Sequence, residues 1–170
     1  AIFGSGRVKY QTYQSITGNA AAPQRSGRSL QLKIGTSQVL DPTQRIRITL
    51  EKTRNSTARR FNSYDRYEIS GTHTKLFEGG DFLLSSLTFT RDGYDGNDPI
   101  VASNLRIDKA ARARVTYGIP LGTLADDAPE FFKPFTLTVS AEAFRQVSSI
   151  TNFTYNNYRA SVGVNRRWEF

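Results

Sequence analysis

The single histidine of the chain, His73, is the first residue to consider for catalysis, because a histidine beside a serine can activate a hydroxyl nucleophile. It lies in the segment SGTHTK, whose serine is Ser70. Successive side chains of a strand point to opposite faces, so residues three apart do not share a face. A catalytic pair must lie within hydrogen-bond reach. The sequence therefore predicts no catalytic residues and no enzymatic activity.

A second group of candidate residues lies in RDGYDGNDP, where Asp92, Asp95, Asn97 and Asp98 supply oxygen atoms that suit calcium. The spacing departs from the EF-hand pattern and lacks its closing glutamate, so a solvated loop is favoured over a metal site. The chain has no cysteine and a single histidine, which leaves no thiolate or histidine site for zinc. It also has no glycine-rich phosphate loop. We expect neither a metal nor a cofactor.

The net charge of +8 favours contact with polyanions such as nucleic acid, lipopolysaccharide phosphates or acidic polysaccharide. A nucleic-acid site needs basic residues on one face together with aromatic side chains that stack on bases. Arginines recur on one face of several segments, which leaves a soluble RNA-binding barrel as an alternative, but we expect no nucleic-acid partner. The segments predicted to be outer loops contain Arg25, Arg28, Arg59 and Arg60. These side chains could form ion pairs with lipopolysaccharide phosphates, and the alternative is that they are simply solvated.

These candidates must be positioned by strands, as the final segment NNYRASVGVNRRWEF illustrates. Apolar residues occupy alternate positions in it, and arginines and a glutamate lie between them. A period of two is typical of a strand with one apolar and one polar face. In a water-soluble sheet the apolar face would cover a core, whereas in a membrane barrel it would face lipid.

The same alternation recurs along the chain and predicts an all-β protein with eight strands in a single domain, residues 1–170. No run of apolar residues is long enough for a transmembrane helix, and this does not exclude transmembrane strands. The predicted strands are Arg7–Thr17, Ser29–Val39, Arg45–Thr53, Asp65–Leu76, Asp81–Arg91, Leu105–Leu121, Phe135–Val147 and Thr154–Phe170.

Short and long connections alternate between these segments. LDPTQ and FEGGD are short and contain the proline and glycine of tight turns, whereas GNAAAPQRSGR, RNSTARRFNSY and RDGYDGNDPIVASN are long and polar. An outer membrane barrel has short periplasmic turns and long external loops. GTLADDAPEFFK is the exception, because it is long where a short turn is expected. The pattern predicts an eight-stranded antiparallel up-and-down transmembrane barrel.

A closed barrel of eight strands has an interior that side chains fill, so charges on its inner face must pair. The predicted inner charge network comprises Lys33, Arg45, Arg47, Glu51, Arg66, Glu68, Arg112, Arg114, Glu142, Arg159 and Arg167. Cations outnumber carboxylates in this set. Either some of them lie at the rim, or the interior holds an anion or water, or the barrel is wider.

Aromatic residues near the strand ends would either form the girdles found at membrane interfaces or pack as ordinary side chains of a sheet. The candidates are Tyr10, Tyr13, Tyr64, Tyr67, Tyr117, Tyr155, Tyr158 and Trp168.

The final segment resembles the assembly signal of bacterial outer membrane β-barrel proteins, in which alternating apolar residues precede a terminal phenylalanine. Val162, Val164, Trp168 and Phe170 match this pattern, while Arg166 stands where that family usually has an apolar residue. The segment SAEAFRQVSSITNFTYNNYRASVGV is also loosely similar to the last strand pair of the surface lipoprotein assembly modifier and exopolysaccharide-export barrels, which have more strands. The resemblance implies insertion into the outer membrane by the barrel-assembly machinery.

The expected role is that of a structural, anchoring or assembly component of the bacterial outer membrane, without catalysis. Its partners would be outer membrane lipid and lipopolysaccharide, the assembly machinery and proteins of a larger envelope complex. Two alternatives stay open. One is a narrow pore or export component that forms part of a larger or oligomeric barrel, and the other is a soluble calycin-like barrel with an internal ligand.

Overall fold

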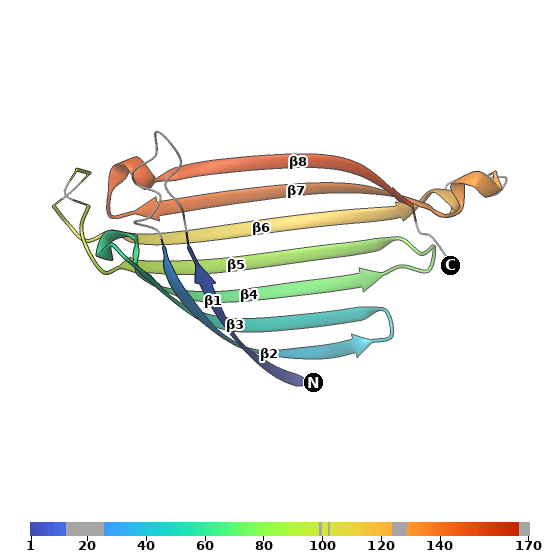
Figure 1. Ribbon diagram of the computed structural model, residues 1–170. Coiled ribbons are helices and arrows are strands. Elements are labelled where there is room, and N and C mark those ends of the chain that lie inside the picture. Colours follow the sequence, from blue (N-terminus) through green and yellow to red (C-terminus); the bar gives the residue numbers. More distant parts are fainter. Residues whose placement is uncertain (13–25, 99, 102, 124–128, 167–170) are drawn as a thin grey trace.

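The chain folds as one antiparallel sheet of eight strands that pair in chain order (Figure 1). The computed structural model describes residues 1–12, 26–98, 100–101, 103–123 and 129–166. The strands are β1 (Ile2–Gln11), β2 (Gly27–Asp41), β3 (Gln44–Thr57), β4 (Tyr64–Leu76), β5 (Phe82–Tyr94), β6 (Ile107–Pro120), β7 (Phe135–Ser148) and β8 (Tyr155–Arg166). Short 3-10 helices occupy connections: η2 (Arg60–Asn62), η3 (Leu121–Thr123), η4 (Glu130–Phe132) and η5 (Thr151–Phe153). In the described part of the chain, no helix is long and apolar enough to cross a membrane.

The prediction of an all-β protein with eight up-and-down antiparallel strands is confirmed. The first predicted strand was misplaced, because β1 begins at Ile2 rather than Arg7; residues 13–17 lie outside the described residues. Likewise β8 is described as far as Arg166, and residues 167–170 lie outside. Strand β3 continues to Thr57, beyond the predicted end at Thr53, because its polar end still pairs with β2.

The sheet is open in the part of the chain that the structure describes. Strand β1 pairs with β2 and β8 pairs with β7, and no ladder joins β1 to β8. Figure 1 shows the sheet curling, since β1, β2 and β3 run at an angle to β6, β7 and β8. A closed barrel would need an additional β1–β8 ladder, because closure pairs both edges.

The connections largely alternate in length as predicted. Residues 42–43 and 77–81 form short turns, whereas β5 and β6 are joined by residues 95–106. In the β4–β5 turn the amide of Gly80 donates to the carbonyl of Phe77 at 2.9 Å, and Gly80 has a φ of 85°, which favours glycine. The connection between β6 and β7, predicted as the exception, is long and contains η3 and η4.

Side chains that face one another across the ladders share a face, and this divides the sheet into two surfaces. On what we call the apolar face lie exposed side chains such as Leu32, Leu50, Leu87 and Val139. On the opposite, polar face lie Lys33, Glu51 and their cross-strand partners. In β2 the polar-face residues from Ser29 to Ser37 are partly shielded, while the apolar-face residues between them are exposed.

Burial in this protein is therefore inverted relative to a water-soluble domain. No apolar side chain is buried among the described residues, and the buried side chains are those of Thr53, Ser63, Asp92 and Asp108. The accessible surface is 12221 Å², whereas a compact monomer of 19.1 kDa exposes about 8,400 Å². The apolar face has no covering layer within the described part of the chain.

Two phenylalanines lie on the polar face because each covers a glycine of the neighbouring strand. Phe82 lies opposite Gly118, and a Cβ atom on Gly118 would come within 2.2 Å of the Phe82 ring. Phe3 covers Gly35 in the same way, with a corresponding distance of 2.5 Å. An aromatic ring over a glycine protects a backbone that has no side chain of its own.

Candidate functional site

The cross-strand register brings the predicted charge network together on the polar face. Lys33, Glu51 and Glu68 are successive partners across β2, β3 and β4. The other described members on this face are Arg45, Arg47, Arg66, Arg112, Arg114, Glu142 and Arg159. Arg167 lies outside the described residues.

One part of the network is centred on Glu51. Lys33 Nζ lies 2.8 Å from Glu51 Oε2, and the side-chain amide of Gln31 also donates to this carboxylate. Thr53 Oγ1 donates to Glu51 Oε1 at 3.3 Å. The Glu51 side chain is only 8% exposed, so these donors replace the water that a carboxylate loses on burial. Glu68, directly opposite, places a second carboxylate beside this centre.

A second part of the network holds two buried aspartates side by side. Asp92 and Asp108 are cross-strand partners on β5 and β6, and both are buried. Arg66 binds Asp92 through two hydrogen bonds, of 2.7 and 2.6 Å. Arg106 binds Asp108, with its Nε atom 3.0 and 2.9 Å from the two carboxylate oxygens. Each arginine neutralises one carboxylate, which offsets the repulsion between neighbouring like charges.

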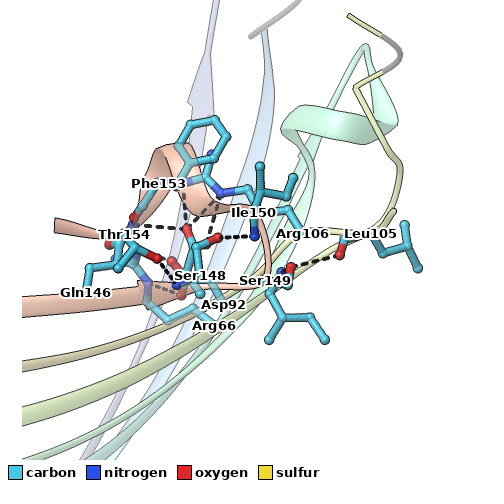
Figure 2. Close-up of polar contacts among 12 residues, drawn as sticks. Arg66, Asp92, Leu105, Arg106, Gln146, Ser148, Ser149, Ile150, Phe153 and Thr154 are labelled. Atoms are coloured by element: carbon cyan, nitrogen blue, oxygen red, sulfur yellow. Dashed lines mark hydrogen bonds and ion pairs between the residues drawn. The ribbon is translucent and has the colours of Figure 1, made fainter. Parts of the chain in front are cut away.

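The connection between β7 and β8 fixes Arg106 from above (Figure 2). Its guanidinium lies 3.5 Å from the ring centroid of Phe153 and 4.6 Å from that of Tyr94. Gln146 Nε2 donates to the carbonyl of Phe153 at 3.0 Å, and Ser149 Oγ donates to the carbonyl of Leu105 at 3.0 Å. These contacts hold η5 against the start of β6. They lie at the end of the polar face where the connections β3–β4, β5–β6 and β7–β8 are found, which we call the long-connection end.

Arginines outnumber carboxylates in the remainder of the polar face. Glu142 lies directly between Arg114 and Arg159 in the register, and Arg112 Nε lies 3.9 Å from it. A cavity of about 140 Å³ is lined by Arg114, Glu142 and Arg159. Arg45 and Arg47, which are also exposed, have threonines as their partners on β4. The carboxylate of Glu142 is therefore shared by several arginines, and the net charge in this part of the polar face is positive.

The apolar face includes the described residues of the predicted assembly signal, Val162 and Val164, which are 72% and 58% exposed. Trp168 and Phe170 lie outside the described residues, as does Tyr13. The apolar face also includes Tyr10, Tyr67, Tyr117 and Tyr158. Tyr64 and Tyr155 lie on the polar face instead, so the candidates for an interfacial girdle are divided between the two faces.

The residues first considered for catalysis lie on different faces. His73 is on the apolar face, where its Nε2 atom is 3.3 Å from Gln44 Oε1. Ser70 is on the polar face and shares a 2.5 Å hydrogen bond with Thr49. His73 and Ser70 are therefore not arranged as the base and nucleophile of one catalytic site.

Two aspartates of RDGYDGNDP, Asp92 and Asp95, are bound by arginines, whereas Asp98 accepts a hydrogen bond from the amide of Ile100 at 3.0 Å. Asp92 binds Arg66, whereas Asp95 binds Arg54, which also reaches Asp65 at 2.8 Å. The hydrogen bonds and charge of Arg54 hold the pKa of Asp95 below its ordinary value. Within the described ranges, no group of three or more side chains is arranged to hold a metal ion.

The basic residues predicted for outer loops have different locations. Arg28 was wrongly placed in a loop, because it lies within β2, where it is exposed. Arg59 and Arg60 do lie in the connection between β3 and β4 and are exposed. Arg25 lies outside the described residues.

The polar network around Arg106 and Asp108 was not predicted. Asp108 is the second residue of β6, and alternation alone does not identify its cross-strand partner. Its pairing with Asp92 depends on how the connection between β5 and β6 sets the register. The alternation of charged and apolar residues in β6 was the only available indication.

Comparison with known proteins assigns no family to the chain. A scan against protein-family models finds no match, and neither a search of curated proteins nor a search of solved structures finds a similar protein. Functional conclusions therefore depend on the physical properties of the two faces.

Proposed function

We propose that the sheet forms the wall of a β-barrel in a bacterial outer membrane, with its apolar face toward lipid and its polar face toward the lumen. The observation that carries the proposal is the inverted burial: no described apolar side chain is buried, while Asp92 and Asp108 are. In water, a surface with this much exposed apolar area would promote association. In lipid the same surface is the favourable one.

The strand lengths and connections also support this proposal. The strands have 10 to 15 residues, and a tilted strand needs about 9 to 11 residues to cross a bilayer. Antiparallel neighbours satisfy the backbone along each ladder, which lipid cannot do. In this role the chain is a structural, anchoring or assembly component without catalysis, and the resemblance of its last strand implies insertion by the barrel-assembly machinery.

A pore or export component is a second candidate, favoured by the open sheet and the accessible polar face. The side chains of Lys33 and Arg112 are 37% and 54% exposed, and a cavity of about 440 Å³ is lined in part by Arg66, Arg112 and Phe144. The interior of a closed eight-stranded barrel would be filled. Additional strands, from a longer chain or from other subunits, would give a wider lumen, and the excess of arginine would favour anions in it.

The test uses single cysteines, because the chain has none of its own. Val139 and Ser140 are adjacent on β7 and face opposite sides of the sheet. Nitroxide labels on Val139→Cys and Ser140→Cys are compared after reconstitution of the chain into phosphatidylcholine vesicles. We expect the Val139 label to collide with oxygen, which partitions into lipid, and to be shielded from a water-soluble nickel chelate. Contact of this label with the nickel chelate would refute the proposal.

The Ser140 label separates the two candidate functions. A water-filled lumen exposes it to the nickel chelate, whereas a filled interior shields it from both reagents. Conductance across a planar bilayer provides an independent measurement: the pore predicts anion-selective conductance and the filled scaffold predicts none. A soluble calycin-like barrel, the remaining alternative, predicts a protein that stays monodisperse in buffer without detergent; the exposed apolar face gives this alternative no support.

A further inference from the structure

A row of basic side chains crosses the apolar face just below the long connections. Lys52, Tyr67, Arg91 and Lys109 are successive cross-strand partners on β3, β4, β5 and β6. Arg145 on β7 lies diagonally from Lys109, because Val147 is the direct partner of Lys109. We call Lys52, Arg91, Lys109 and Arg145 the basic row.

The basic row borders a groove in the apolar face. The groove has a volume of about 970 Å³ and extends across strands β1 to β7. Its apolar lining includes Leu32, Leu50, Ile69, Phe89 and Ala111. All members of the basic row also line it, so the groove is cationic along the side nearer the long connections and apolar along its other side.

The cations of the basic row repel one another in the isolated chain. Arg91 and Lys109 are directly opposite, so their Cβ atoms are about 5 Å apart, and like charges in such positions are destabilising. No member of the row forms an ion pair within the described part of the chain. Asp65, diagonal to Arg91, is bound by Arg54. Lys52 lies over the ring of Tyr67, at 5.1 Å from its centroid. The row lacks a counter-anion.

We propose that this groove binds a phosphorylated membrane lipid, whose phosphate lies among Arg91, Lys109 and Arg145 and whose acyl chains follow the apolar lining. The inference rests on the proposed function, because it places the apolar face in lipid. Arginine can bind phosphate through two parallel hydrogen bonds, and lysine adds a point charge. The apolar stems of these side chains can stay in contact with hydrocarbon while their charged ends reach the headgroup.

The change from cationic to apolar lining across the groove matches a lipid better than a free anion or an acidic protein. A lipid has its anion next to extended hydrocarbon, as the groove has its cations next to Phe89 and Ala111. A soluble anion would use the cations and leave the apolar lining uncovered. An acidic protein would need polar partners, and the described lining beside the basic row is largely apolar.

The experiment measures lipid selectivity in vesicles of phosphatidylcholine that contain a small fraction of spin-labelled phosphatidic acid. The motionally restricted fraction of the label gives its association constant relative to labelled phosphatidylcholine. We expect the chain to prefer phosphatidic acid and the variant Arg91→Gln/Lys109→Gln to lose this preference, by about fivefold for each cation removed. The control, Arg45→Gln/Arg114→Gln, removes the same charge from exposed positions of the polar face and should keep the preference.

Each result decides between the proposal and its competitors. Equal losses in the variant and the control would overturn it, since net charge alone would explain the preference. Displacement of the labelled lipid by inorganic phosphate would assign the row to a soluble anion and would also overturn it. Insertion into vesicles without selectivity refutes the groove but leaves the proposed function standing. Failure to insert into phosphatidylcholine vesicles refutes both.

Discussion

The two faces of the sheet differ in whether the chain itself supplies their partners. On the polar face, Asp108 is 4% exposed and is bound by Arg106 and Gln146. On the apolar face, Val162 is 72% exposed and no described segment covers it. The polar face is thus stabilised largely from within the molecule, whereas the stability of the apolar face depends on the medium that surrounds it.

This difference explains how a protein without a buried apolar core can still have a defined structure. Backbone ladders fix the neighbours of each strand, and charge pairs such as Arg66 with Asp92 add specific contacts at the long-connection end. In the proposed membrane location, lipid would supply the hydrophobic burial that is the main stabilising contribution in water-soluble domains. Substitutions on the two faces should therefore respond differently to a change of medium.

Loss of Arg106 should have the largest effect. Arg106→Met keeps the apolar contact with Phe153 but leaves the Asp108 carboxylate buried without its cation. We expect the free energy of unfolding in vesicles, measured with urea, to fall by about 3 to 5 kcal/mol. The double variant Arg106→Met/Asp108→Leu should recover much of this loss, because the uncompensated charge is gone.

The matched control is the exposed pair of Lys133 and Glu130, whose side chains are 55% and 87% exposed. Lys133→Met should change the free energy of unfolding by less than about 1 kcal/mol. If Arg106→Met and Lys133→Met lower the free energy of unfolding equally, the charge pair on the polar face is no better shielded from water than an exposed pair. The contrast between the two faces then disappears.

Alternation of residue types was sufficient to predict most strands and the facing of their side chains. It describes the surroundings of side chains, so it ended β3 at Thr53, although the polar residues as far as Thr57 still pair with β2. Alternation also does not explain why Phe82 lies on the polar face. Its ring covers Gly118, which is far away in the sequence. Closure and the pairing of Asp92 with Asp108 depend on contacts between distant segments, which a local pattern does not contain.

A charge on the apolar face should have the next largest effect. Leu87→Arg places a cation on the apolar face of β5. If this face contacts lipid as proposed, the free energy of unfolding in vesicles should fall by about 2 to 4 kcal/mol. Thr90→Arg, on the opposite face of the same strand, is the control, because it places the cation opposite Glu68. Equal costs for the two variants would contradict a lipid-facing surface.

Filling the space under Phe82 should have a smaller effect. Gly118→Val places side-chain atoms where the ring now lies, so the ring must move, at a cost of about 1 to 3 kcal/mol. Phe82→Ala should make Gly118→Val better tolerated, which a double-mutant cycle in vesicles would measure. If the losses of unfolding free energy of the two single variants add up in the double variant, the ring and the glycine are not coupled. The polar face would then tolerate changes of side-chain shape as readily as the apolar face.

The smallest effect concerns pH and the link between Arg54 and Asp95 beside the long connections. Because the pKa of Asp95 is lowered in the folded state, the unfolded state binds more protons at acid pH, and stability rises with pH through that range. The stabilisation is fully present above the ordinary aspartate value of 3.8 and is lost as the pH falls through the lower, folded value. As the pH falls below 3.8, Asp95→Asn should therefore lose less unfolding free energy than the parent chain, by less than about 1 kcal/mol because the pair is partly exposed. Parallel urea titrations at neutral and acid pH measure the difference, and identical pH dependences would place the acid sensitivity in the buried carboxylates of the polar face instead.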